Sequence, residues 1–222
     1  MKFVVLMENT APEASCLAAE HGLSMYIEFR GRRLLLDAGA SGQFADNAAA
    51  LGIDRARLAV GGDSAGGALA AACTQWARDC TPIRLCFQLL VYPVTDSRMQ
   101  TGSIRRGRDT PCWNASLNRR MWQIYLREGD GGHPAWAAPM LADRFDGLPP
   151  AYLEVEQFDC LHDEGLAYAD ALEGAGVPVQ RQEVAGTVHG FDVFRDVPIV
   201  RTMIETRSRA LRAAFGTAEG GR

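Results

Sequence analysis

The chain has 222 residues, of which 47% are hydrophobic and 23% charged, so its length and composition predict one compact domain. A net charge of −4, with arginines dispersed along the chain, disfavours nucleic acid and anionic membranes as partners and favours a small molecule. The apolar run at residues 3–7 ends at Glu8, which makes it too short for a signal-peptide core or a membrane span.

The first third is predicted to consist mainly of strands. Residues 2–7, 24–29 and 32–37 are rich in β-formers, and Gly31 supplies a tight turn between the last two segments. Residues 41–51 carry apolar side chains at helical spacing and stop before Gly52, which is typical of a helix end. We therefore expect a strand, a hairpin and then a helix.

Strands and helices alternate through the rest of the chain. A strand at 57–61 leads into an Ala-rich helix at 64–77, and further strands are expected at 84–92, 151–155 and 179–184. Helical patterns cover about 117–128, 163–175 and 198–215. The segment 97–114 is predicted to be a loop that borders a pocket, and 217–222 a frayed tail.

This alternation predicts an α/β fold, with a mixed, mostly parallel sheet covered by helices on both faces and antiparallel hairpin strands at one edge. We expect a single α/β domain over residues 1–222. Six cysteines are dispersed without a C-x-x-C pair, which predicts reduced thiols and a cytoplasmic protein. They are Cys16, Cys73, Cys80, Cys86, Cys112 and Cys160.

The pentapeptide GDSAG at 62–66 matches the G-x-S-x-G pattern, in which small residues let a serine occupy a sharp turn between a strand and a helix. Here the pattern lies between a predicted strand and a predicted helix, so Ser64 is the candidate nucleophile. The N–H of Ala65, at the start of that helix, is a candidate donor to an oxyanion.

A serine nucleophile needs a base, and the chain holds only four histidines. His189 follows the last predicted strand, at the sheet edge where Ser64 emerges, and Asp159 follows the strand at 151–155. The order Ser, Asp, His is that of the α/β-hydrolases. Alternatives stay open, because His189 could cap loop backbone and the acids near Asp159 could cap a helix. The other histidines are His21 and His133, expected in loops, and His162, expected at a helix start.

Residues 51–194 resemble the hormone-sensitive-lipase-like branch of α/β-hydrolase esterases. The motifs are VGGDSAGG at 60–67, VYPVTD at 91–96, GLPPA at 147–151, FDCLHDEG at 158–165 and HGF at 189–191. The resemblance implies an α/β-hydrolase fold, carboxylic esters as substrates and no cofactor. It also implies Ser64 as nucleophile, Asp159 as acid and His189 as base.

Residues 1–54 lack the cap and the His-Gly-Gly-Gly loop of that branch, and they resemble the start of a metallo-β-lactamase-fold hydrolase. The resemblance rests on EHGLS at 20–24, the hairpin at 26–37, Gly39 and residues 47–54. The zinc-binding H-x-H-x-D-H loop does not follow, so we expect no metal site. The chain is thus interpreted as a fusion, in which a truncated hydrolase (55–216) carries a grafted hairpin.

In this interpretation the strand at 32–37 lies beside the strand at 57–61, because a right-handed crossover joins them. The loop after it would then replace the missing glycine loop, with Gly39 and Ala40 as second oxyanion donors. Aromatic residues are expected to border the site and contact substrate, although a core role is an equal alternative. They are Trp113, Trp122, Phe158 and Phe191.

The sequence therefore predicts a serine carboxylesterase that hydrolyses small or short-chain esters through an acyl-enzyme. One alternative is a weakly active or inactive fusion that acts as a binding scaffold or a homodimer through the surface left bare by the missing cap. Another is a zinc-dependent hydrolase.

Overall fold

The computed structural model describes residues 2–7, 24–29, 32–36 and 58–216. The chain divides into two compact units, Met1–Ala59 and Val60–Arg222, each described below by itself. No helix in these described ranges is long and apolar enough to cross a membrane.

The first unit contains a three-stranded antiparallel sheet in the order β1-β2-β3. Its strands are β1 (Lys2–Met7), β2 (Ser24–Phe29) and β3 (Arg32–Leu36). In β2, Ile27 pairs with Phe3 of β1 and with Leu34 of β3. The predicted hairpin and the strand before it are therefore confirmed. The predicted helix at 41–51 lies outside the described residues.

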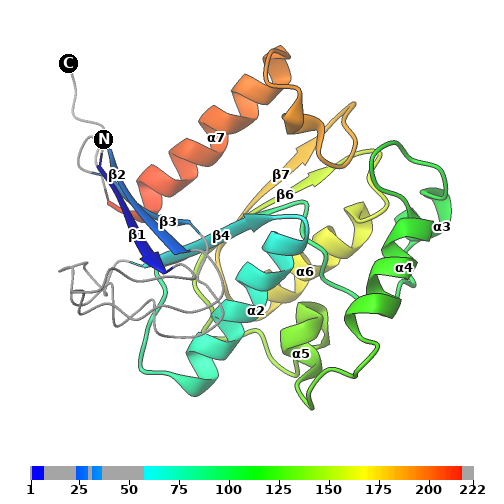
Figure 1. Cartoon of the computed structure of the whole chain (residues 1–222), viewed down its shortest axis with the longest axis horizontal. Helices are drawn as coiled ribbons and strands as arrows, with labels where there is room; N and C mark the ends of the chain where they lie inside the picture. The colour runs from blue at the N-terminus through cyan, green and yellow to red at the C-terminus, as the bar shows by residue number, and fades with distance from the viewer. Residues whose placement is uncertain (1, 8–23, 30–31, 37–57, 217–222) are drawn as a thin grey trace. The chain divides into compact units, whose positions relative to one another are not determined.

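The second unit is built on a four-stranded sheet in the order β4-β5-β6-β7, shown in Figure 1. β5 and β6 are parallel, as are β6 and β7. The strands are β4 (Ala59–Asp63), β5 (Phe87–Val91), β6 (Ala151–Glu156) and β7 (Val179–Val184). The expected α/β class is confirmed. Among the described strands, β1 to β3 pair within the first unit and β4 to β7 within the second.

Helices cover both faces of this parallel sheet, with α2 and α6 on one side and α7 on the other (Figure 1). The long helices are α2 (Ala65–Cys80), α4 (Ala115–Tyr125), α6 (His162–Gly174) and α7 (Pro198–Ala214). Shorter ones are α3 (Gly102–Arg106), α5 (Pro134–Ala137) and the 3-10 helices η2 (Pro139–Leu141) and η3 (Phe191–Val193).

The segment 97–114, predicted to be a loop, contains the short helix α3. The Thr101 side chain caps it by accepting a hydrogen bond from the N–H of Ile104 at 3.4 Å. Further along, the Asn114 side chain accepts hydrogen bonds from Ser116 and Leu117 and begins α4. Ser, Thr and Asn in this segment therefore act as helix caps.

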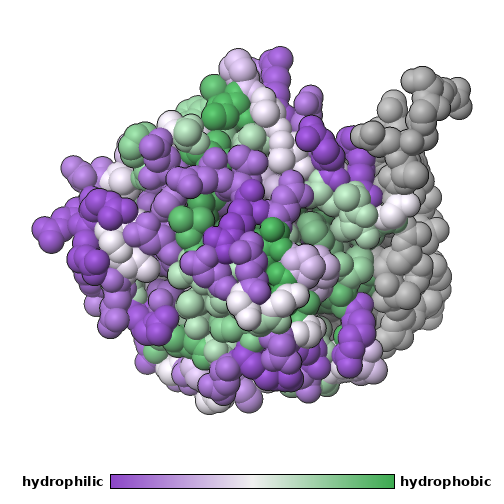
Figure 2. Space-filling model, turned by 180° about the vertical axis from the view of Figure 1, so that it is seen from behind, coloured by the Kyte–Doolittle hydropathy of each residue, from purple (hydrophilic) through white to green (hydrophobic). Residues whose placement is uncertain are grey.

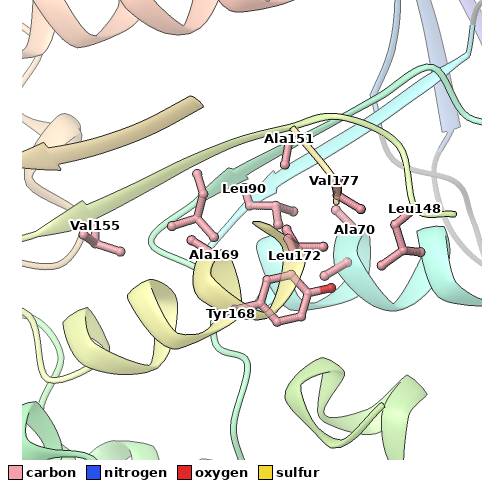
Figure 3. Packing of buried hydrophobic residues seen from close by; sticks show 11 residues of the cluster. Ala70, Leu90, Leu148, Ala151, Val155, Tyr168, Ala169, Leu172 and Val177 are labelled. Atoms are coloured by element: carbon pink, nitrogen blue, oxygen red, sulfur yellow. The ribbon is translucent and has the colours of Figure 1, made fainter. Parts of the chain in front are cut away.

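The largest apolar core cluster lies between the sheet and helices α2 and α6 (Figure 3). Strand β6 contributes Ala151, Leu153 and Val155, which point to this side because alternate residues of a strand share a face. They pack with Leu90, Tyr168, Leu172 and others. The candidate site is built just beyond the carboxyl ends of β4, β6 and β7.

Candidate active site

Ser64 occupies the sharp turn between β4 and α2. Its backbone has φ 56° and ψ −119°, a region that residues other than glycine rarely adopt. The Ser64 N–H donates to the carbonyl of Val91 at 2.9 Å, and the Ser64 carbonyl accepts from Ala68 at 3.1 Å. These bonds hold a strained backbone in place, and such strain is concentrated at functional sites.

Two glycines make this turn sterically possible. A Cβ on Gly62 would lie 2.3 Å from the carbonyl carbon of Gly66, far closer than atoms can approach. A Cβ on Gly67 would lie 2.9 Å from the Cβ of Pro93. Gly67 follows the pentapeptide, so the pattern G-x-S-x-G alone did not identify it as part of the turn.

The structure brings His189 and Asp159 to Ser64 from two other strand ends. His189 lies in the turn after β7, and its Nε2 is 2.8 Å from the Ser64 Oγ. Its Nδ1 is 2.6 Å from Oδ2 of Asp159, which follows β6. The three side chains thus form a continuous hydrogen-bonded chain over residues separated by 125 positions in sequence.

The hydrogen bond between His189 and Asp159 is shielded from water, since Asp159 is 3% and His189 8% exposed. The second carboxylate oxygen of Asp159 accepts from the N–H of Leu161 at 2.9 Å, which fixes the orientation of the carboxylate. In this arrangement Nδ1–H donates to Asp159, and Nε2 is left to accept a proton from Ser64.

The neighbouring acids are engaged elsewhere. Asp163 accepts from the Ser103 N–H at 2.7 Å and lies 2.8 Å from Nδ1 of His162. Glu164 accepts from the Thr95 N–H at 2.7 Å, and burial raises its pKa to about 8. Among these three acids, Asp159 is the one bonded to His189.

A family model for the α/β-hydrolase fold matches residues 35–193, which is more than half of the chain. The chain belongs to the α/β-hydrolase family. The esterase relatives place it in the hormone-sensitive-lipase-like branch that its motifs resemble. The match begins within β3, before the point at 51–54 where the sequence interpretation placed the junction.

Several relatives of this α/β-hydrolase bear esterase names. Esterase LipI of Mycobacterium tuberculosis is 36% identical over 199 residues, covering 89% of this chain and 59% of LipI. An ethyl acetate hydrolase of Pseudomonas putida is 38% identical over 150 residues, covering 66% of this chain and 46% of the relative. A solved bacterial heroin esterase superposes with a TM-score of 0.72 at 37% identity, covering 77% of this chain and 55% of the other. The chain therefore spans about half the length of these proteins.

The oxyanion donors expected in this α/β-hydrolase are only partly described. Ala65 is the first residue of α2, where helix geometry leaves the backbone N–H without an acceptor in its own helix. Gly39 and Ala40, expected as second donors, lie outside the described residues.

The four aromatic residues expected at the site differ in position. The Trp113 ring centroid lies 6.0 Å from that of His189, and Phe158, next to Asp159, is exposed. Trp122 and Phe191 are buried in two core clusters, in line with the alternative that these aromatics are core.

Tyr92 was missed by the sequence reasoning as a site residue. Its ring centroid lies 4.7 Å from that of His189, and its backbone has a positive φ of 36°. A signal existed, because Tyr92 directly follows β5 and so lies at the same sheet edge as Ser64 and His189. Within the described residues, no group of three His, Cys, Asp or Glu side chains could hold a metal ion.

Proposed function

We propose that Ser64, His189 and Asp159 are the catalytic triad of a serine carboxylesterase that hydrolyses small or short-chain esters. The observation that carries the proposal is the hydrogen-bonded chain from the Ser64 Oγ through both nitrogens of His189 to Asp159. The strained, glycine-lined turn at Ser64 supports it, since this geometry exposes the hydroxyl at the end of the sheet.

The reaction proceeds in two acyl-transfer steps. Ser64 Oγ attacks the ester carbonyl while Nε2 of His189 takes the hydroxyl proton, and the imidazolium then protonates the leaving alkoxide. Water, deprotonated by His189, next attacks the acyl-enzyme and releases the acid. Asp159 holds the imidazole tautomer, and the N–H of Ala65 stabilises the oxyanion, with Gly39 and Ala40 as proposed second donors.

Substrate size is part of the proposal. Support comes from the relative named ethyl acetate hydrolase and from Trp113, whose ring stands beside the His189 imidazole. Phe158 offers a further exposed aromatic surface next to Asp159. We therefore expect short acyl groups to be cleaved, with Trp113 and Phe158 as substrate contacts and no cofactor required.

A fluorophosphonate probe and p-nitrophenyl acetate test this function. We expect wild type to be labelled and to release p-nitrophenol, and Ser64→Ala to lose both signals. Ser116→Ala, which changes an exposed serine of α4, serves as the matched control. A folded wild type that neither labels nor turns over would contradict the esterase. Loss of turnover on adding a chelator would instead favour the zinc-dependent alternative.

The scaffold alternative has one supporting observation. Val193 and Phe194, just after the His189 turn, are 70% and 58% exposed, and such apolar surface can bind a second copy. On the face shown in Figure 2, however, apolar residues lie in separate patches among hydrophilic ones. This alternative includes a homodimer that forms through Val193 and Phe194. Sedimentation of wild type and of Phe194→Ser tests it, since only wild type should sediment as a dimer.

The proposed fusion with a metallo-β-lactamase-like segment at 1–54 rests on sequence resemblance and the hairpin of β2 and β3. The LipI alignment is longer than the stretch that follows Asp54, so it extends into this segment. This favours an α/β-hydrolase origin, rather than a metallo-β-lactamase one, for part of residues 1–54. The proposed cytoplasmic location rests on the dispersed cysteines of the sequence, which lack a C-x-x-C pair.

A further inference from the structure

A buried ion network lies behind His189, on the sheet face covered by α7. Arg207 of α7 donates through Nε to Glu154 of β6 at 3.1 Å and through Nη1 to Asp192 of η3 at 2.6 Å. Its Nη2 donates to the other oxygen of Glu154. Glu154 is fully buried and the Arg207 side chain is 14% exposed, so water competes little for these bonds.

This network reaches His189 through Tyr92. Asp192 lies three residues after His189, and its Oδ1 accepts a hydrogen bond from the Tyr92 hydroxyl at 2.7 Å. The Tyr92 ring then packs against the imidazole, with ring centroids 4.7 Å apart and planes tilted by 58°. Arg207, Asp192 and Tyr92 therefore form a chain of contacts that ends on the candidate base.

The backbone of Tyr92 is strained, with a positive φ of 36°. A positive φ on a residue other than glycine is strained and persists only where surrounding contacts hold it. The Tyr92 N–H donates to the carbonyl of Glu154 at 2.8 Å, and its hydroxyl is held by Asp192. The ring between these two anchors has little freedom to leave the imidazole.

The surroundings of Tyr92 and Asp192 keep each group in the protonation state that its hydrogen bond needs. Burial and the bond to Asp192 raise the pKa of Tyr92, so its hydroxyl stays a donor. Burial alone would raise the pKa of Asp192, but hydrogen bonds from Arg207 and Tyr92 lower it, so the carboxylate stays ionised. The hydrogen bonds that Asp192 accepts from Tyr92 and Arg207 therefore persist across the neutral pH range.

We propose that Tyr92, locked in place by Asp192 and Arg207, is a positioning residue that holds the His189 imidazole in line between Ser64 and Asp159. This role rests on the proposed esterase function. An imidazole free to rotate would leave Nε2 off the Ser64 proton path, and a displacement of about 1 Å can cost about 100-fold in rate.

A buried tyrosine elsewhere in the same unit provides the matched control. The Tyr168 hydroxyl accepts a hydrogen bond from Gln75 at 3.3 Å within the apolar cluster of α2 and α6. Tyr168→Phe removes one buried hydroxyl, as Tyr92→Phe does, but acts on the other face of the sheet. A merely structural role for Tyr92 would make the two variants behave alike.

The experiment compares Tyr92→Phe, Asp192→Asn and Tyr168→Phe with wild type. It measures kcat and KM for p-nitrophenyl acetate, the melting temperature, and the downfield proton NMR signal of the hydrogen bond between His189 and Asp159. We expect kcat to fall about 10- to 100-fold in the first two variants, with KM within about twofold and the downfield signal broadened. Tyr168→Phe should change the melting temperature alone.

Wild-type kcat and an unchanged NMR signal in Tyr92→Phe would overturn the positioning role, as would equal losses of kcat in both tyrosine variants. If wild type itself shows no turnover, the proposed function fails and the NMR signal decides the positioning role by itself. If Asp192→Asn does not fold, Tyr92→Phe decides, because it keeps the ring and its packing volume.

Discussion

Strand β6 has two faces that are equally buried and chemically opposite. Toward α6, Leu153 and Val155 enter an apolar cluster. Toward α7, Glu154 and Glu156 are both fully buried, and Glu154 is paired with Arg207. Apolar packing contributes stability without fixing one orientation, whereas hydrogen-bonded charges have few acceptable geometries. The difference suggests that the first face stabilises the fold and the second orients the site.

The polar face also carries a cost. Neither carboxylate oxygen of Glu156 has a hydrogen-bond partner among the described residues. Burial, together with the nearby charges of Glu154 and Asp159, raises the pKa of Glu156 to about 10. A neutral carboxyl group at this position avoids a third buried negative charge, so the polar face depends on one of its acids staying protonated.

The largest expected effect is at Asp159, which follows the end of β6. Asp159→Asn should lower kcat by about 10³- to 10⁴-fold, because an amide favours the wrong imidazole tautomer. Steady-state kinetics on p-nitrophenyl acetate measure this, with the melting temperature as a check on folding. Near wild-type turnover in a folded variant would remove Asp159 from the proposed triad.

The apolar face should respond in the opposite manner. Leu153→Ala should lower the free energy of unfolding by about 2–5 kcal/mol through lost burial and a residual cavity, while kcat per folded molecule stays near wild type. Urea unfolding and kinetics at low temperature measure the two quantities. A loss of kcat equal to that of Asp159→Asn would show that the apolar face also orients the site.

The pH dependence of stability tests whether Glu156, on the polar face, stays protonated. Its pKa is near 4.5 when unfolded and about 10 when folded, so the folded state holds the extra proton between these values and stability falls as pH rises. The slope is at most about 1.4 kcal/mol per pH unit. Glu156→Gln stays neutral, so its stability relative to wild type should increase from pH 6 to pH 9. Parallel stability curves for the two proteins would show that Glu156 does not titrate in this way.

The smallest effect is expected for an ion pair outside both faces. Arg181 of β7 pairs with Asp170 and Glu173 at 2.7 and 2.6 Å, and all three are partly open to solvent. Arg181→Gln should cost less than about 1 kcal/mol, and less still in high salt. Urea unfolding at two salt concentrations measures it. A cost similar to that of Leu153→Ala would show that this surface ion pair contributes as much to stability as a buried leucine.

The existence of the strands was predicted because their signal is local, although β4 and β5 span 59–63 and 87–91 where 57–61 and 84–92 were expected. The strand at 179–184 has the predicted bounds, and β6 extends one residue beyond its prediction. Helix ends show errors of the same size, since α2 continues to Cys80 rather than residue 77. The short helices α3 and α5 were missed, because a helix of a few residues lacks a repeating apolar pattern.

The candidate site was predictable to the extent that chemistry and chain order limit it. A serine in a tight turn, one histidine after the last strand and one acid after β6 were identified by position, and the structure places them within hydrogen-bond distance. The roles of the aromatics were not, because local sequence does not reveal that Trp122 is buried in a core cluster while Trp113 is half-buried beside His189.

By itself the sequence determined the alternation of strands and helices, the family motifs and the three residues of the candidate triad. Only the tertiary structure decided which residues surround His189, since Arg207 meets Glu154 across 53 positions and Tyr92 meets Asp192 across 100. Such contacts depend on which faces of distant elements pack together. Local periodicity shows that a face exists, whereas its partner is selected by packing across the whole unit.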